Sequence, residues 1–571
     1  MHLRYGTWFD LAIIVVYLGF CVLVGIYYKR RAEKSFEEYF LAGRTIPTVV
    51  LTSSIMATFI STVTIVGIPG LAYKIGIAGM IFNSISMYFL RYGAVFYGPY
   101  VRKILPTTIM TLPEMAEHLY NSRAHLASTI LSIIFNISRF GTQFLAVGFL
   151  LNFLFGISIL WGAAISALVV LSYTVLSGFI AEAITDVFQM LFMLIGVGLA
   201  TILGLQHFGG WENVIAALPK SHLVWHGKEP LMALVAYAIM AFYMYPDPSF
   251  YQRYSAGRSP KQVQFAMSAM ILLSSMFGII CCINAMMARA LFPEMTPALA
   301  IYSFLERFLP PGIFGLWLAA FVAAGMSTGD TYMLIGATNI SRDLYKRWIR
   351  RDATDAQVIR LTRVLMIFLA LVSTYVVIQF KTVWSIWSWG AMMFASAIFV
   401  PLVPGILWRW RKHPDSAWIA IASALAIFIP LYPPPAIAPK YVGDLARFIG
   451  VEPFSPAHQA YIFLGAWFVS TLVYLFVNLS FGTKPPEREY RKPEQSPKQL
   501  TDQARFYNRN TFLVSLLFWL LAPTAIIVSI IGGGIASILW YFLGGLNVVF
   551  GLIILWQVIR ARKELLAFKQ S

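Results

Sequence analysis

The chain has 571 residues, of which 59% are hydrophobic and only 12% are charged. Soluble domains typically contain about 45–50% apolar and about 25% charged residues, so this composition predicts a protein that is embedded in a lipid bilayer. It excludes soluble enzymes and intrinsic disorder. The net charge of +18 is spread over short loops between apolar runs, which is typical of membrane proteins and does not indicate nucleic-acid binding. The three cysteines fall in apolar runs and indicate no disulfide framework.

The apolar runs predict about 15 membrane-spanning helices, because a bilayer core needs about 20 mostly apolar residues per helix. The first run lacks a small-residue cleavage site, so we interpret it as a retained helix and not as a signal peptide. The predicted spans are 8–28, 45–69, 77–101, 124–153, 157–178, 183–205, 231–250, 264–291, 312–340, 358–380, 382–408, 416–433, 459–481, 510–531 and 533–559.

Lysine and arginine are unevenly divided between the two sets of loops. About three quarters of these 43 residues follow odd-numbered spans, including Arg253, Arg258 and Lys261 after the seventh. Cytoplasmic loops carry the excess of positive charge in membrane proteins. The sequence therefore predicts a multi-pass protein of the plasma membrane with its N-terminus outside and its C-terminus in the cytoplasm.

Two predicted spans contain residues that interrupt helices. Gly67-Ile68-Pro69-Gly70 lies in the second span, and Tyr245-Pro246-Asp247-Pro248 lies in the seventh. Proline removes a backbone donor, and glycine loosens a helix further. Either break alone could be a simple kink. The pair, five spans apart, instead indicates two five-helix units of opposite orientation, an arrangement typical of secondary transporters.

This arrangement predicts an all-α polytopic membrane protein in three parts. Residues 1–44 hold an extra N-terminal helix and a basic cytoplasmic loop, and residues 45–411 hold the transport core. The core consists of repeat one (45–205) and repeat two (231–411). Residues 412–571 add C-terminal helices, which are interrupted by a Pro-, Lys- and Glu-rich cytoplasmic loop at 482–510.

Six short motifs follow one another in a fixed order over roughly residues 8 to 411. They are Tyr39-Phe40-Leu41-Ala42-Gly43-Arg44, Gly67-Ile68-Pro69-Gly70 with Tyr73, Thr185-Asp186-Val187-Phe188-Gln189, Gln252-Arg253-Tyr254, Met326-Ser327-Thr328 and Asp343-Leu344-Tyr345. This set resembles the sodium:solute symporter family, which includes sodium–glucose and sodium–proline carriers. The resemblance implies a leucine-transporter-like 5+5 inverted repeat and alternating access driven by sodium (Na+), the expected coupling ion.

The resemblance also implies a sodium site between the second and ninth spans. The carbonyl oxygens of Ala57, Ile60 and Ala324 and the hydroxyl groups of Ser327 and Thr328 occupy the matching positions. Sodium is a hard cation that favours such oxygen ligands. From the residues alone, the two hydroxyl groups could instead bond back to carbonyls one turn earlier in their own helix.

Ionisable residues within spans are expensive and indicate function by default. The resemblance places Asp186 near the sodium pathway. Asp330 and Thr331, together with Asp186, could form a second cation or proton site, and the alternative is that Asp330 is a buried partner of an arginine. Glu182, one turn before Asp186, is interpreted either as functional or as a loop residue at the membrane surface.

Arg139 lies in the middle of the fourth span. It either pairs with Asp330 or another carboxylate, or binds an anionic group of the solute. Arg91, near the end of the third span, is expected to be structural. The other solute-binding positions implied by the resemblance are Phe59, Thr62, Thr64, Phe82, Asn83, Ser86 and Asp247.

Sugar-carrying relatives have a glutamate near the position of Asn83 and a lysine near that of Cys281, and proline-carrying relatives have an aspartate in place of Phe59. This chain has none of these residues. We therefore expect a sodium-coupled symporter that imports a small organic anion or zwitterion, such as a monocarboxylate or an amino acid. The alternatives are a proton-coupled carrier, with Asp330 and Glu182 as titrating groups, and a non-transporting solute sensor.

The expected partners are the solute, sodium ions and the lipid bilayer, without nucleic acid. Enzyme chemistry is not expected, because the eight histidines are scattered and neither metal-ligand spacing nor a phosphate-binding loop is present. The identity of the solute, the ion stoichiometry and the oligomeric state stay open at the level of sequence.

Overall fold

A computed structural model describes residues 5–85, 91, 93–224, 231–377, 379–380, 382–407 and 411–483. The chain divides into two compact units, Met1–Pro485 and Pro486–Ser571. The second unit lies outside the described residues, and so do the predicted spans 510–531 and 533–559. Within the described residues the protein is helical and has no β-strand, only one isolated bridge between Lys412 and Thr483.

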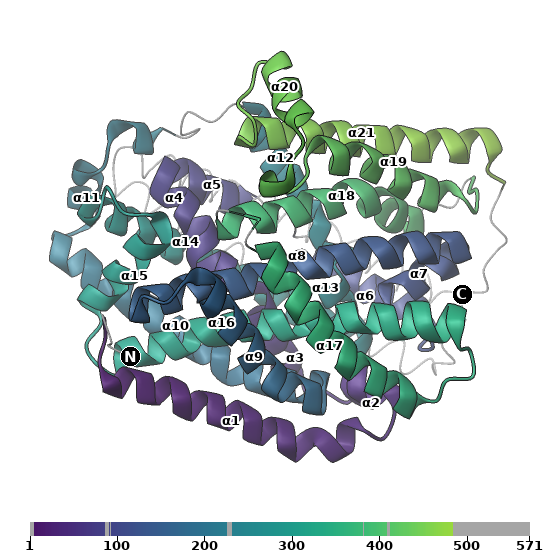
Figure 1. Ribbon diagram of the computed structural model, residues 1–571, viewed down its shortest axis with the longest axis horizontal. Coiled ribbons are helices and arrows are strands. Elements are labelled where there is room, and N and C mark those ends of the chain that lie inside the picture. The colour runs from purple at the N-terminus through teal and green to yellow at the C-terminus, as the bar shows by residue number, and fades with distance from the viewer. Residues whose placement is uncertain are drawn as a thin grey trace, which may run out of the picture. The chain divides into compact units, whose positions relative to one another are not determined.

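The helices follow one another along the chain with short connections (Figure 1). The first half contains α1 (Trp8–Ala32), α2 (Phe36–Leu41), η1 (Ala42–Arg44), α3 (Thr48–Phe59), η2 (Val63–Gly67), α4 (Ile68–Ile75), α5 (Ile77–Ile85), α6 (Ala94–Ile104), α7 (Leu112–Leu119), α8 (Ser122–Phe155), α9 (Ile159–Ser177), α10 (Phe179–Phe208), α11 (Trp211–Ala217) and η4 (Lys220–Leu223).

The second half contains α12 (Leu231–Met240), η5 (Ala241–Met244), α13 (Pro248–Ala256), α14 (Pro260–Leu291), α15 (Pro297–Phe308), α16 (Ile313–Thr338), η6 (Asn339–Ile349), α17 (Asp355–Val377), α18 (Val383–Leu407), α19 (Ser416–Leu431), η7 (Pro435–Ile437), α20 (Lys440–Phe448) and α21 (Pro456–Phe481).

Each predicted span from 8–28 to 459–481 coincides with one of these helices or with a broken series of them. Of the described helices, eight are long and apolar enough to cross a membrane, or up to nine if a bent pair at Phe36–Arg44 and Thr48–Phe59 counts as one span. The all-α prediction is confirmed, whereas the number of about 15 spans and the 5+5 repeat stay predictions.

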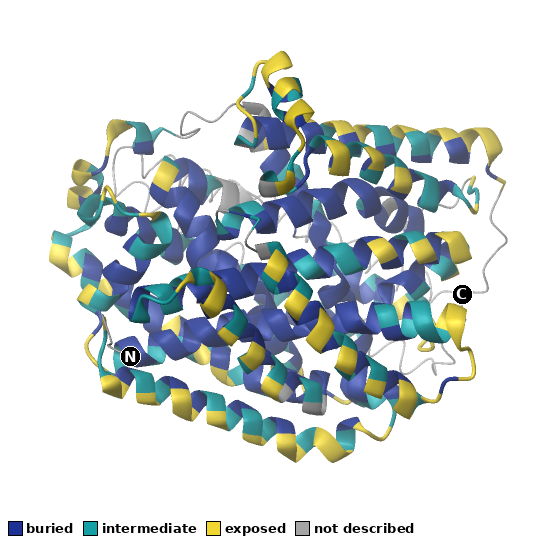
Figure 2. Cartoon of the chain, viewed as in Figure 1, coloured by how far each residue is buried: buried dark blue, intermediate teal, exposed yellow. Residues whose placement is uncertain are grey.

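Three long helices form the centre of the described unit. α8, α16 and α18 are mostly buried, and α8 packs against both of the others (Figure 2). By contrast, α1 runs along the outside and exposes large apolar side chains such as Trp8 and Phe9 (Figure 2). An apolar exterior around a buried centre is expected where lipid, and not water, is the solvent.

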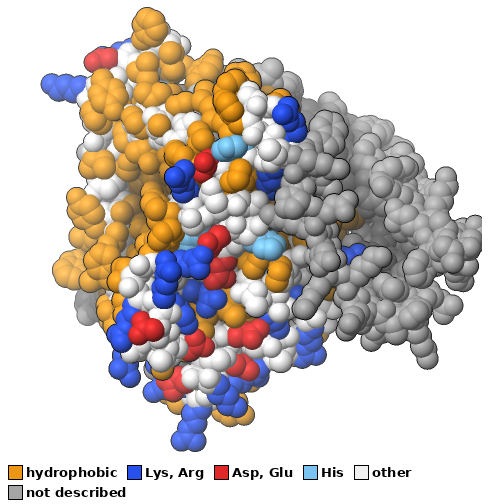
Figure 3. All heavy atoms as spheres, turned by 90° about the vertical axis from the view of Figure 1, so that its right-hand side faces the viewer, with side chains coloured by type: hydrophobic (Ala, Val, Ile, Leu, Met, Phe, Trp, Pro, Cys, Tyr) orange, Lys and Arg blue, Asp and Glu red, His pale blue; other side chains and the backbone are white. Residues whose placement is uncertain are grey.

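Charged side chains gather over the lower part of one end of the molecule, while hydrophobic side chains cover an adjoining flank (Figure 3). Ion pairs at residues of the predicted cytoplasmic loops include Arg342–Glu114 at 2.7 Å and Arg363–Glu33 at 2.9 Å. Lys346–Asp355, at 3.2 Å, is another. These contacts join α7, η6, α17 and the end of α1, so residues predicted to share the cytoplasmic side do pair with one another.

The two interrupted helices differ in how well the sequence locates them. α3 ends at Phe59, and the backbone leaves the helix at Ile60 (φ −78°, ψ 73°) before resuming through the π-helical turn η2. The break predicted at Gly67–Gly70 is therefore misplaced, because Pro69 sits in the first turn of α4, where its missing N–H is tolerated. The second interruption falls where predicted, between η5 and the start of α13 at Pro248.

Helices α8 and α9 approach each other through glycine. A Cβ atom on Gly162 would lie 2.9 Å from the Cα atom of Gly148, and one on Gly148 would lie 2.7 Å from the carbonyl oxygen of Ile159. Small residues permit such close packing between membrane helices. Substitution Gly162→Ala should destabilise the protein by about 1–3 kcal/mol through overpacking, and thermal unfolding in detergent measures the loss.

A matched control is Gly198→Ala in α10, where a Cβ atom would meet no heavy atom within 4 Å. Alanine is favoured over glycine in helices by about 1 kcal/mol, so this variant should keep or raise the unfolding temperature. Equal unfolding temperatures for the two variants would contradict the proposed tight contact.

Candidate ion and solute sites

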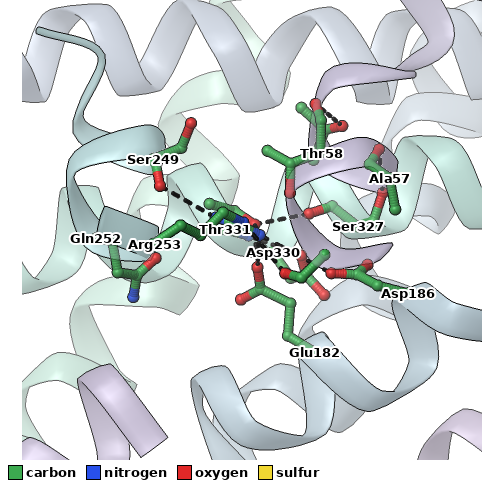
Figure 4. Close-up of polar contacts among 12 residues, drawn as sticks. Ala57, Thr58, Glu182, Asp186, Ser249, Gln252, Arg253, Ser327, Asp330 and Thr331 are labelled. Atoms are coloured by element: carbon green, nitrogen blue, oxygen red, sulfur yellow. Dashed lines mark hydrogen bonds and ion pairs between the residues drawn. The ribbon is translucent and has the colours of Figure 1, made fainter. Parts of the chain in front are cut away.

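The last turn of α3 directs carbonyl groups at hydroxyl groups of α16. The carbonyl oxygen of Ala57 accepts a hydrogen bond from Ser327 Oγ at 3.2 Å, and that of Thr58 accepts one from Thr328 Oγ1 at 3.2 Å (Figure 4). Carbonyls in the last turn of a helix have no intrahelical partner, so they need other donors. Ser327 Oγ also lies 3.3 Å from the carbonyl oxygen of Ala324.

The structure thus brings together Ala57, Ala324 and Ser327 from the predicted sodium site, with Thr328 bonded one residue further along α3. Ile60 is buried and lies at the interruption itself. The alternative, in which both hydroxyl groups only bond back within α16, is wrong for Thr328 and holds only in part for Ser327. The cluster consists of uncharged oxygen atoms, a donor set that suits a hard cation.

A buried arginine organises the polar groups on the neighbouring turn of α16. Arg253 of α13 donates from Nη2 to Glu182 Oε1 at 2.6 Å and to Thr331 Oγ1 at 3.1 Å (Figure 4). Its Nε atom donates to Ser54 Oγ at 3.1 Å, and its Nη1 atom donates to the carbonyl oxygen of Ser249 at 3.3 Å. One guanidinium group therefore connects α3, α10, α13 and α16.

Two acidic side chains of α10 face this arginine, but only one is hydrogen-bonded to it. Asp186 Oδ2 forms a longer ion pair with Arg253 Nη2 at 3.9 Å, and neither carboxylate oxygen has a hydrogen-bond partner in the described part of the chain. Asp330 Oδ1 accepts the backbone N–H of Thr331 at 2.7 Å. The predicted ion-coupling residues Asp186, Asp330 and Thr331 are thus close together, with Arg253 among them.

Sequence reasoning missed this role of Arg253 and left two interpretations of Glu182 open, of which the structure disfavours the surface one. Arg253 was counted as a loop residue, yet it is fully buried, and Glu182 is 1% exposed instead of lying at a membrane surface. The signal was present in the spacing: Glu182 and Asp186 are four residues apart and so share one helix face. Two buried carboxylates on one face require a cation, and Arg253 follows directly after a helix break.

A double-mutant cycle measures the strength of this buried pair. Arg253→Met should lower the stability by about 3–5 kcal/mol, because it leaves two buried carboxylates without their cation. Combined with Glu182→Gln, the loss should be smaller than the sum of the two single losses. Thermal unfolding in detergent is the readout.

The control is the exposed pair Arg447–Asp444, whose side chains are 72% and 69% exposed. Arg447→Met should leave the unfolding temperature unchanged, since exposed ion pairs contribute little. Strict additivity of the losses at Arg253 and Glu182 would refute the coupling.

Beside the oxygen cluster lies a small cavity with a volume of about 20 Å³, room for about one water molecule. It is bounded mainly by α3, η2, α8, η5, α16 and α18. Its lining comprises Thr58, Phe59, Ser61, Val63, Thr64, Ile68, Arg91, Arg139, Gln143, Tyr243, Phe250, Thr328, Tyr332 and Trp387.

Arg139 is 1% exposed, and three aromatic rings surround its guanidinium group. Its guanidinium carbon lies 4.2 Å from the ring centroid of Tyr243, 4.5 Å from that of Phe135 and 4.9 Å from that of Trp387. None of its three guanidinium nitrogens has a hydrogen-bond partner within the described structure, where no carboxylate forms an ion pair with it. The expected structural pairing with Asp330 or another carboxylate is therefore not found.

The other predicted solute-binding residues separate into groups. Phe59 and Thr64 line the cavity, and Thr64 Oγ1 donates to the carbonyl oxygen of Phe59 at 3.1 Å. Thr62 does not line it, because its hydroxyl group donates to Gln143 Oε1 at 2.6 Å.

Asp247 does not line the cavity but contacts a residue that does. Its Oδ2 atom accepts a hydrogen bond at 2.8 Å from the hydroxyl group of Tyr332, which is a lining residue. Phe82 and Asn83 belong to α5, but their side chains are outside the described part of the structure, and Ser86 is outside it altogether.

The buried helices, the interrupted segments and the adjacent oxygen and guanidinium clusters define a helical membrane protein with polar groups at its centre. A model of the sodium:solute symporter family matches residues 39–415. The chain belongs to this family. A model of the sugar-specific permease component of PTS systems matches residues 348–564, which is less than half of the chain.

Curated relatives point to the same class. The sodium/glucose cotransporter of Vibrio parahaemolyticus is 25% identical over 402 residues, covering 63% of this chain and 73% of the relative. Sodium/proline symporter 2 of Staphylococcus saprophyticus is 25% identical over 390 residues, covering 65% and 76%. A solved Na+-coupled sialic acid symporter superposes with a TM-score of 0.68 at 20% identity, covering 84% of this chain and 99% of that one.

The protein is therefore a sodium-coupled solute symporter and a multi-pass integral membrane protein, and not an enzyme. Its fold is that of the solved sialic acid symporter. Sequence reasoning did not identify Gln143, Tyr243, Tyr332 and Trp387 as cavity residues. The sequence carried no signal for them, because aromatic and amide side chains are common in packed membrane helices.

Proposed function

We propose that the protein imports a small organic anion or zwitterion, such as a monocarboxylate or an amino acid, together with sodium. The observation that carries this proposal is Arg139, a buried guanidinium group in the cavity without a hydrogen-bond partner among the described residues. A guanidinium group binds a carboxylate through two parallel hydrogen bonds. A buried charge is costly when unpaired, so a bound anion would relieve this cost.

The sodium ion in this proposal lies between α3 and α16. It is bound by the carbonyl oxygens of Ala57, Ile60 and Ala324 and by the hydroxyl groups of Ser327 and Thr328. Thr328 supports a link between ion and solute, because it bonds to Thr58 and both residues also line the cavity. An ion that fixes α3 against α16 thereby fixes one wall of the solute cavity.

The transport cycle in this proposal is alternating access. Sodium and solute bind from outside, and relative movement of the two five-helix units, 45–205 and 231–411, opens both sites to the cytoplasm. Sodium would leave past Asp186, which lies on α10 beside the oxygen cluster. A membrane potential contributes about 2.3 kcal/mol per charge per 100 mV and so favours this release. In the proposed orientation the N-terminus is outside, and the charged end seen in Figure 3 faces the cytoplasm.

A second ion position in this proposal is the group of Asp186, Asp330 and Thr331. The two carboxylate oxygens of Asp186 are buried and accept no hydrogen bond in the described structure, which supports a proton or a second cation there. Arg253 already supplies one positive charge at this position.

Substitution of both Ser327 and Thr328 by alanine should raise the sodium concentration needed for half-maximal uptake at least about tenfold, because two of five ligands are lost. Bound sodium stabilises the folded state by mass action. The unfolding temperature of the wild-type protein should therefore rise with NaCl relative to choline chloride at equal ionic strength, and that of the variant should not.

The control for this test is Ser423→Ala in α19, whose hydroxyl group donates to the carbonyl oxygen of Ala420 away from the proposed site. It should keep the sodium response. An unchanged sodium dependence in the Ser327/Thr328 variant would show that the ion binds elsewhere.

The proposed function itself is tested by tracer-sodium influx into proteoliposomes with single candidate solutes outside. Short carboxylates, amino acids, sugars and polyols form the panel. Stimulation by a carboxylate or an amino acid supports the proposal. Stimulation by a sugar or polyol alone, or sodium-independent uptake that rises at low external pH, would overturn it.

A further inference from the structure

The cavity contains a second buried arginine. Arg91 is 2% exposed, and its guanidinium carbon lies 5.1 Å from the ring centroid of Phe59 and 5.5 Å from that of Tyr243. Tyr243 is also the ring closest to Arg139, at 4.2 Å. The two guanidinium groups therefore share one aromatic ring in one cavity, although Arg91 was expected from the sequence to be structural.

No carboxylate occurs among the described lining residues of this cavity. Asp247 acts electrostatically on both guanidinium groups but is not an ion-pair partner of either within 4.0 Å in the described structure. Its Oδ1 atom accepts from the backbone N–H and the hydroxyl group of Ser249, and its Oδ2 atom accepts from Tyr332. Asp247 thus accepts three hydrogen bonds, and the formal charges of two arginines and one aspartate sum to +1.

The cavity is also poor in acceptors for an ammonium group. Backbone carbonyls at the end of the interrupted helix would have to be shared, because those of Ala57, Thr58 and Phe59 each accept one hydroxyl group. The oxygens of Asp247 are likewise in use. An ammonium group would meet two guanidinium groups and no available carboxylate.

We propose that the solute is a monoanion without a positively charged group, and that Arg91 and Arg139 bind its carboxylate together. This inference rests on the proposed function and narrows it, because it excludes zwitterionic amino acids. The apolar part of the solute lies against the rings of Phe59, Phe250 and Trp387, which line the same cavity. One negative charge neutralises the local sum of +1, whereas a zwitterion leaves it unchanged.

The first experiment compares solutes that differ only in the ammonium group. Propionate is matched with alanine, and 3-phenylpropionate with phenylalanine, in tracer-sodium influx into proteoliposomes that contain the full chain. One or both carboxylates should stimulate sodium influx. The matching amino acid should reach the same influx only at a concentration at least about tenfold higher. Equal or better stimulation by the amino acid would overturn the inference while leaving sodium symport intact.

Succinate tests the charge count separately. A dianion would overcompensate a local sum of +1, so succinate should stimulate more weakly than propionate. A preference for succinate would overturn the monoanion assignment. If none of the solutes stimulates influx in vesicles whose protein still shows stabilisation by sodium, the proposed function fails together with this inference.

The second experiment assigns the role of Arg91. Arg91→Gln should raise the propionate concentration for half-maximal influx at least about tenfold, and Arg91→Lys should recover part of the loss because it keeps the charge. Stabilisation by sodium, measured as a thermal shift without solute, should stay as in the wild type. The control is Arg447→Gln on the exposed surface of α20, which should behave as wild type.

A purely structural role gives a different pattern. Arg91→Gln would then lower the unfolding temperature with and without propionate and leave the half-maximal propionate concentration unchanged. That result would remove Arg91 from the solute site and overturn the shared binding of the carboxylate.

Discussion

The interruption of α3 after Phe59 is the constraint on which the candidate sites depend. A helix that ends inside an apolar protein leaves carbonyl groups without backbone donors, and no water is available to satisfy them. Hydroxyl groups of α16 and η2 serve those of Ala57, Thr58 and Phe59. The same geometry that satisfies the backbone therefore gathers uncharged oxygen atoms at one place. In this way an interruption of regular structure becomes a candidate ligand set for sodium.

The charged side chains that surround α16 differ in sign from one turn of this helix to the next. Near Thr331, the carboxylates of Glu182 and Asp186 outnumber the one guanidinium group of Arg253. Near Thr328, one turn earlier, the cavity contains two guanidinium groups and no carboxylate among its described lining residues. A cation and an anion bound at neighbouring positions attract each other, and the coupling between two such sites is reciprocal. This arrangement supports the proposed co-transport of sodium with an anion.

Much of the helical architecture could be predicted from the sequence, because apolar runs of sufficient length admit few other structures in a membrane. The break before Pro248 could be located as well, since proline marks it. The break in α3 could not, because Ile60 and Ser61 carry no sequence signature, whereas Pro69 and its flanking glycines do. Arg253 could not be predicted either. An arginine near the end of a span is counted as a loop residue in water, and only the folded structure shows that Glu182 lies beside it.

The cavity shows the limit of single-span reasoning. Arg139 could be recognised as unusual from its depth in one span, but its environment is built by Tyr243 of η5 and Trp387 of α18, which are remote in sequence. Aromatic rings attract a guanidinium group through their faces yet accept none of its directional hydrogen bonds. Burial among rings therefore removes the hydration of Arg139 without replacing its hydrogen bonds. In the proposed function a bound carboxylate supplies the missing acceptors, so the contacts that leave the guanidinium group of Arg139 unsatisfied in the protein also favour binding of an anion.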